Sequence, residues 1–79
     1  MELLERLYDV KGWLDLNEHQ KSVLFLVFQD HAKNYEGARL AKMKRVEKDP
    51  KDENQVRVYY EDEWFHYSID TETGHSIWY

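Results

Sequence analysis

Cysteine, long apolar runs and an N-terminal positive charge are all missing from this chain of 79 residues. Without cysteine there is neither a disulfide framework nor a thiolate zinc site. No apolar run exceeds six residues, whereas a membrane-spanning helix needs about 20. The segment Met1–Glu5 is acidic where a secretory signal peptide would be positively charged. These absences predict a cytoplasmic protein without a membrane partner. The length of 79 residues predicts a single domain over residues 1–79.

Catalytic and metal-binding patterns are lacking as well. Ser68 lies two positions from His66, but no nucleophile-elbow glycines flank it. His66 and His75 are expected on adjacent strands roughly 13 Å apart, too far for one zinc ion. His19 and His31 lie more than three turns apart on a predicted helix. We therefore expect no enzyme activity, no metal site and no other cofactor.

The only long apolar run, Val23–Phe28, is preceded by a helix start signal. Asn17 is a good N-cap, and Gln20 can reach back to it in a capping box. This pattern predicts a central helix at about 18–36, with Gly37 at its C-terminal end. A strand is the alternative, because short apolar runs are ambiguous. A helix that is apolar all round is buried on several sides, either between two elements of its own chain or against a second copy.

The segments before and after this helix differ in how clearly they can be interpreted. Residues 2–11 have the apolar spacing of a short amphipathic helix, which Gly12 is expected to end. A connector follows, and its apolar side chains are expected to lie on the central helix: Trp13, Leu14 and Leu16. Residues 38–48 have a composition that slightly favours helix. A strong turn signal follows at 49–54, so a first hairpin strand at 40–48 is the alternative.

From Gln55 onward the apolar residues recur at every second position, which predicts strands at 55–60, 64–69 and 75–79. The expected fold is α+β, with N-terminal helices on one face of an antiparallel meander. A two-residue loop at 62–63 would place Tyr60 opposite Phe65, and a four-residue loop at 71–74 would place Tyr67 opposite Trp78. One face then carries the predicted core residues Val56, Val58, Tyr60, Phe65, Tyr67, Ile69 and Trp78.

The opposite face of the predicted sheet is unusually aromatic for a solvent face. It carries Arg57, Tyr59, Trp64, His66, Ser68, His75, Ile77 and Tyr79. Trp, Tyr and Arg are enriched at binding hot spots. We therefore predict a partner-binding surface made of Arg57, Tyr59, Trp64, His66, Ile77 and Tyr79. The alternatives are that residues 38–48 cover this face, or that it binds nucleic acid or a small molecule.

Charge is distributed unevenly along the chain. Residues 1–38 carry a net charge of −3, residues 39–51 of +4 and residues 52–79 of −6. Such a distribution is that of a solvated surface of mixed sign, or of a bipolar surface that steers a charged partner. The small size, acidic composition, lack of cysteine, apolar helix and aromatic sheet face together predict a non-catalytic protein that binds another protein stoichiometrically. Inhibitors or modulators of a larger host protein have such a profile in phages and mobile elements. The partner could also be a second copy in a homodimer, and the alternative is a nucleic-acid or nucleotide binder that uses residues 39–51.

Overall fold

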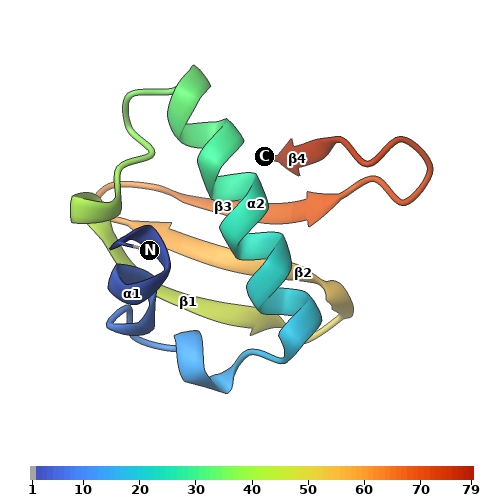
Figure 1. Ribbon diagram of the computed structural model, residues 1–79, viewed down its shortest axis with the longest axis horizontal. Coiled ribbons are helices and arrows are strands. Elements are labelled where there is room, and N and C mark those ends of the chain that lie inside the picture. Colours follow the sequence, from blue (N-terminus) through green and yellow to red (C-terminus); the bar gives the residue numbers. More distant parts are fainter. Residues whose placement is uncertain (1) are drawn as a thin grey trace.

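Two helices lie on one face of a four-stranded antiparallel sheet (Figure 1). The computed structural model describes residues 2–79. Its elements are α1 (Glu2–Tyr8), η1 (Trp13–Asp15), α2 (Glu18–Asn34), η2 (Leu40–Lys42), β1 (Met43–Asp49), β2 (Asp52–Tyr60), β3 (Trp64–Ile69) and β4 (Ser76–Trp78). The strand order β1-β2-β3-β4 is a meander, so the predicted α+β architecture is confirmed. None of the helices in the described chain has the length and apolar character needed to cross a membrane.

The start of α2 is the predicted capping box. The Asn17 side chain accepts a hydrogen bond from the backbone N–H of Gln20 at 2.8 Å, and the Gln20 side chain accepts one from the backbone N–H of Asn17 at 2.9 Å. The helix ends at Asn34 with Tyr35 extended, so Gly37 is not its left-handed cap as expected. A Cβ at Gly37 would lie 2.6 Å from the Tyr35 ring, so a larger residue there would displace that exposed side chain.

Elements of the same chain cover α2 on two sides. Val23, Leu24, Val27 and Phe28 are buried against the sheet and its surroundings, and Phe25 is partly buried beside α1. Leu26 stays half exposed. Within the described chain, α2 therefore lies between other elements of the same chain, which was the first of the two alternatives. These elements do not cover the helix completely.

The connector before α2 differs from the expectation at one residue. Helix α1 ends at Tyr8, short of the predicted residue 11, and the 3-10 turn η1 follows Gly12. Side chains three apart share a side of a 3-10 helix, so Trp13 and Leu16 are both buried. Leu14 points away and is 71% exposed, so its predicted place on α2 is wrong.

The slight preference for a helix at 38–48 is wrong beyond residue 42. Only η2 is helical there, and β1 begins at Met43. Helix propensity is a weak prior, and here pairing with β2 and burial of Val46 outweigh it. The other edge of β1 is tied to the connector, since the Val46 N–H donates to the Lys11 carbonyl at 2.8 Å.

The register of the sheet is confirmed for one hairpin and corrected for the other. Tyr67 pairs with Trp78 as predicted. Phe65, however, pairs with Val58 instead of Tyr60, because the tight loop is Glu61–Asp62. The correction is a shift of two residues, and a shift of two keeps every side chain on its face. The predicted core face is therefore correct, with Val56, Val58, Tyr60 and Tyr67 buried and Phe65, Ile69 and Trp78 packed against them.

The core also contains a titratable group, His31 of α2, whose side chain is fully buried. Its Nδ1 lies 2.7 Å from the Tyr67 hydroxyl, which lies 2.5 Å from the Tyr60 hydroxyl. The rings of Phe65 and Trp78 pack around the imidazole. Burial lowers the pKa of His31 from its usual value of 6.5, and the Glu63 carboxylate partly offsets this.

Candidate functional site

The sheet face opposite the helices, here called the outer face, is not covered by any described element of the chain. It lies behind the sheet in the view of Figure 1. Strand alternation and the observed pairing bring together on it Arg45, Glu47, Asp49, Gln55, Arg57, Tyr59, Trp64, His66, Ser68, Ile77 and Tyr79. Trp64 is 46% exposed and Tyr79 61% exposed, so the predicted aromatic surface is open to a partner.

Four side chains of the outer face form a continuous row of rings. Tyr59 of β2 stacks on Trp64 of β3 with centroids 5.5 Å apart and planes within 18°. Trp64 contacts His66 at 4.9 Å, and His66 stacks on Tyr79 at 4.6 Å and 17°. These contacts follow from cross-strand pairing, because Tyr59 lies opposite Trp64 and His66 exchanges backbone hydrogen bonds with Tyr79.

The row is extended onto β1 by a guanidinium group. Cζ of Arg45 lies 3.8 Å from the centroid of the Tyr59 ring, which is a close cation–π contact. Arg45 is paired with Tyr59 across β1 and β2. The five side chains, Arg45, Tyr59, Trp64, His66 and Tyr79, thus cross the sheet from β1 to the residue after β4. We call them the aromatic row.

Two carboxylates neutralise the cations of the outer face. Glu47 accepts from Arg45 Nη1 at 2.7 Å and from the Tyr59 hydroxyl at 2.8 Å. The hydrogen bond from Tyr59 is the largest cause that lowers the pKa of Glu47, and Arg45 lowers it further. Glu47 also lies 3.8 Å from Arg57. The Glu47 carboxylate therefore fixes both Arg45 and the rim of the Tyr59 ring.

The second carboxylate, Asp49, is almost fully buried by its neighbours. Its Oδ2 lies 3.7 Å from Nε of Arg57 and 3.8 Å from Nε2 of His66. Its Oδ1 accepts the backbone N–H of Lys51 at 2.8 Å, which is the largest cause that lowers the pKa of Asp49. The Asp49 carboxylate thus lies beside both the His66 ring and the Arg57 guanidinium, although Nε of Arg57 makes no hydrogen bond within the described residues.

All six residues predicted as partner-binding lie on the outer face, but they differ in exposure and only four of them belong to the aromatic row. Tyr59, Trp64, His66 and Tyr79 belong to the aromatic row. Ile77 lies beside it, opposite Ser68, and is 36% exposed. The Arg57 side chain is mostly covered, with Cζ 5.7 Å from the Trp64 ring, so it supports the row more than it projects from it.

Sequence reasoning missed the contribution of β1 to this face. Arg45 and Glu47 fall in the segment 38–48, whose composition slightly favours helix over the alternative strand, and Asp49 falls in the turn signal at 49–54. The available signal was the turn at Pro50–Lys51, which joins β1 to β2 as a tight hairpin. With β1 recognised as a strand, alternate positions 45, 47 and 49 fall on one face.

The outer face offers stacked rings and paired charges. Stacked rings with fixed side chains lose little conformational freedom when a partner binds. Among residues 2–79, no three His, Asp or Glu side chains come together as a metal site would require. The outer face thus presents exposed rings, paired charges and fixed side chains.

Comparison with known proteins adds no relative: no protein-family model, curated protein or solved structure matches this chain.

Proposed function

We propose that the chain is a non-catalytic binding protein whose outer face docks onto another protein. The observation that carries this proposal is the aromatic row, which leaves Trp64 and Tyr79 exposed on an otherwise ordered sheet. A contiguous exposed aromatic patch on a protein surface commonly marks an interaction site. Aromatic residues are also the commonest hot-spot residues, and burial of one can contribute 2 kcal/mol or more, as a rough figure, to a complex.

The charges of the face favour a protein over a nucleic acid. Phosphate binding needs cations that are free to replace counterions. Arg45 is paired with Glu47, and Arg57 lies near both Glu47 and Asp49. Lys44, at the β1 edge, is near Glu61. A protein interface with a hydrophobic centre and balanced polar groups is the better match.

The biological role we propose is that of a stoichiometric inhibitor or modulator of a larger cytoplasmic protein, of the phage or mobile-element type. A domain of 9.7 kDa with one rigid aromatic face has enough surface for one standard interface of roughly 800 Å² per partner. A second copy of the chain is the other candidate partner. In that case two outer faces would pack against each other with two-fold symmetry.

The experiment measures first the molar mass of the chain in solution and then its affinity for a partner. Light scattering separates a monomer of 9.7 kDa from a dimer. A protein retained on the immobilised chain is then identified, purified and titrated against wild type, Trp64→Ala and Leu14→Ala. Leu14 is a matched control because it is exposed on the helix side.

The proposal expects Trp64→Ala to weaken the complex, or the dimer, by about 2 kcal/mol or more while Leu14→Ala changes little. Equal binding by wild type and folded Trp64→Ala would show that the outer face is not the docking surface.

A further inference from the structure

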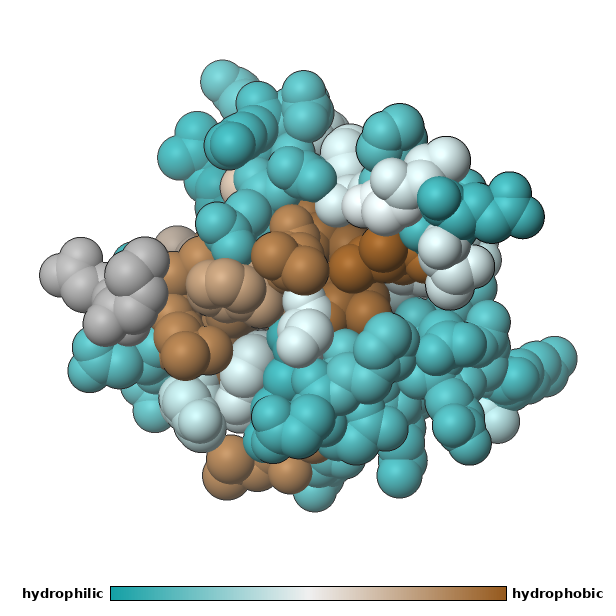
Figure 2. Space-filling view, turned by 45° about the vertical axis from the view of Figure 1, so that its right-hand side comes forward, coloured by the Kyte–Doolittle hydropathy of each residue, from teal (hydrophilic) through white to brown (hydrophobic). Residues whose placement is uncertain are grey.

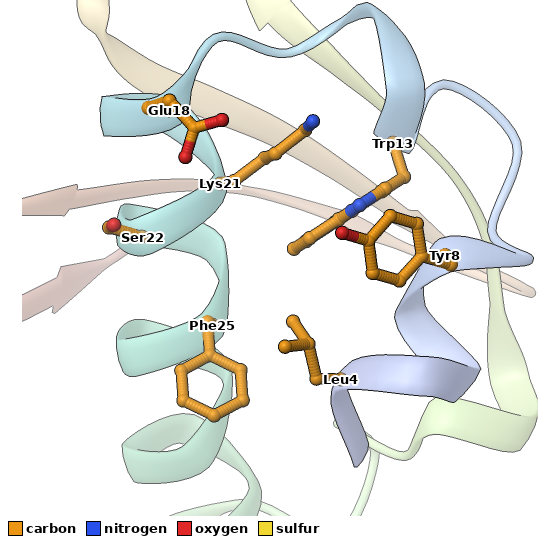
Figure 3. A pocket seen from close by; sticks show the side chains of 7 residues that line it. All are labelled: Leu4, Tyr8, Trp13, Glu18, Lys21, Ser22 and Phe25. Atoms are coloured by element: carbon orange, nitrogen blue, oxygen red, sulfur yellow. The ribbon is translucent and has the colours of Figure 1, made fainter. Parts of the chain in front are cut away.

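A hollow lies on the helix side of the molecule, between α1 and α2. Its volume is about 270 Å³, close to the lower end of ordinary ligand pockets at about 300 Å³. Figure 2 shows a band of apolar side chains that runs across the face of the molecule seen in that view. Figure 3 shows the hollow itself, with Leu4 and Tyr8 on one wall and Phe25 and Lys21 on the other. We call this hollow the helix groove.

The walls of the helix groove are apolar and incompletely covered. Leu4 is 37% exposed and Tyr8 is 50% exposed, although both belong to a helix that packs on the core. Phe25 of α2 is partly buried on the opposite wall. An apolar body inserted between Leu4 and Phe25 would remove this surface from water, which is favourable in proportion to the area buried.

Two polar groups in the helix groove have unused bonding capacity. Trp13 is only 1% exposed, yet its Nε1 donates to no acceptor within the described residues. A buried donor without a partner is rare and calls for a physical reason. The Lys21 ammonium lies 5.9 Å from the Trp13 ring, and no carboxylate in the described chain forms an ion pair with it.

These groups specify the chemistry of a ligand. We propose that the helix groove binds a small amphiphilic carboxylate. Its apolar body lies between Leu4 and Phe25, and its carboxylate pairs with Lys21 and accepts the Trp13 indole N–H. In Figure 3 the indole nitrogen lies beside the half-exposed Tyr8 ring, which packs edge-on against Trp13. Tyr8 swings outward to admit the carboxylate, as a surface side chain can do within nanoseconds.

Among the described residues that line the helix groove, Glu18 is the only acidic one, and its charge limits the ligand to a single small anionic head. Glu18 also lines the hollow, and in Figure 3 the Lys21 ammonium lies between the Glu18 carboxylate and Trp13. Lys21 therefore shields a monocarboxylate from Glu18. A polyphosphate or a nucleic acid would extend past Lys21 and meet the repulsion of Glu18.

The test uses sodium octanoate as the probe and 1-octanol as its neutral counterpart, with the indole N–H signals of the ¹⁵N-labelled protein as the readout. Trp64→Phe and Trp78→Phe identify the Trp13 signal among the three tryptophans. We expect octanoate to shift the Trp13 signal saturably, while 1-octanol binds more weakly and leaves the indole N–H nearly unmoved. Trp64, on the outer face, serves as an internal reference that does not respond.

The matched variants are Lys21→Met and Lys33→Met, two lysines of the same helix. Lys33 is exposed and does not line the helix groove. Lys21→Met should weaken octanoate binding by about tenfold or more, the effect of losing a hydrogen bond to a charged group. The proposal is overturned if no saturable Trp13 shift occurs, if 1-octanol acts like octanoate, or if both lysine variants lose the same affinity. Because Trp64 and its partner are not involved, these results leave the proposed function of the outer face unaffected.

Discussion

His31 Nδ1 and the Tyr67 hydroxyl lie 2.7 Å apart, and both side chains are fully buried. The Tyr60 hydroxyl extends this contact into a chain of three polar groups within the core. The second imidazole nitrogen, Nε2, has no hydrogen-bond partner among the described residues. An imidazolium ion here would have to be buried without an acceptor for its second proton. Burial therefore favours the neutral form of His31, and lowers its pKa.

Acid should destabilise the protein through His31. Because burial lowers the pKa of His31 below its usual 6.5, the unfolded chain binds a proton that the folded chain resists. The contribution of His31 to the free energy of unfolding is complete above pH 6.5 and is lost as the pH falls from 6.5 through the folded-state pKa. Urea unfolding of the wild type between about pH 8 and pH 5 should show this loss.

His31→Gln isolates the effect, because the amide can either donate to or accept from the Tyr67 hydroxyl and does not titrate. We expect a lower free energy of unfolding for this variant at neutral pH, with a flatter pH dependence below pH 6.5. His19→Gln is the matched control, since His19 is exposed on the same helix. If His19→Gln flattens the curve as much as His31→Gln, the buried imidazole is not the cause.

Removal of the Tyr67 hydroxyl should cost more than removal of the Tyr60 hydroxyl. Tyr67→Phe leaves both His31 and Tyr60 without their partner, whereas Tyr60→Phe leaves the bond between His31 and Tyr67 intact. A buried polar group without a partner costs about 1–3 kcal/mol. Urea unfolding at pH 8 should rank the variants in that order, and the reverse order would contradict the central position of Tyr67.

Most residues of the outer face could be predicted from the sequence, because strand alternation is a local pattern and an error of two residues in the strand register does not change which face a side chain is on. The alternation of Val56 and Val58 with Arg57 and Tyr59 specifies the two faces directly. The loop was misplaced by one residue, which shifted the pairing of β2 and β3 by two. An even shift preserves the faces, so Trp64 was still assigned to the correct side.

The aromatic row itself could not be predicted in full, because β1 depends on contacts distant in sequence. Lys42 to Lys48 have helical propensity, and only pairing with β2 makes this segment a strand. Arg45 could be placed over Tyr59 only by giving the turn at Pro50–Lys51 more weight than this helical propensity. The buried role of His31 was also beyond reach, since its burial depends on Tyr67 and Trp78, far along the chain.

Gly12 should be far less tolerant of alanine than Gly74. Both have positive φ, 95° and 76°, so either substitution adds backbone strain of roughly 1–2 kcal/mol. A Cβ at Gly12 would also lie 1.9 Å from the Val46 carbonyl oxygen, whereas a Cβ at Gly74 meets nothing within 4 Å. Gly12→Ala must therefore displace the connector from β1. Thermal unfolding should show a clearly larger loss for Gly12→Ala, and equal losses would mean that this close approach is not important for stability.

The carboxylates of the outer face should determine which class of partner it accepts. In Glu47→Gln with Asp49→Asn, the amide oxygens keep the acceptor positions for Tyr59 and Lys51, but Arg45 and Arg57 lose their counter-charges. Two free guanidinium groups beside exposed rings make a site for single-stranded nucleic acid.

Fluorescence anisotropy with labelled oligothymidylate should therefore detect binding by the double variant and little by the wild type. The logarithm of affinity should fall with the logarithm of salt concentration with a slope of about −1.4, as expected for two phosphate contacts on a single strand. Asp9→Asn with Asp15→Asn is the control, because it changes the net charge equally on the helix side and should not create binding. Salt-sensitive binding by the wild type that is lost in Trp64→Ala would instead identify the aromatic row as a nucleic-acid site and reject the protein-docking proposal.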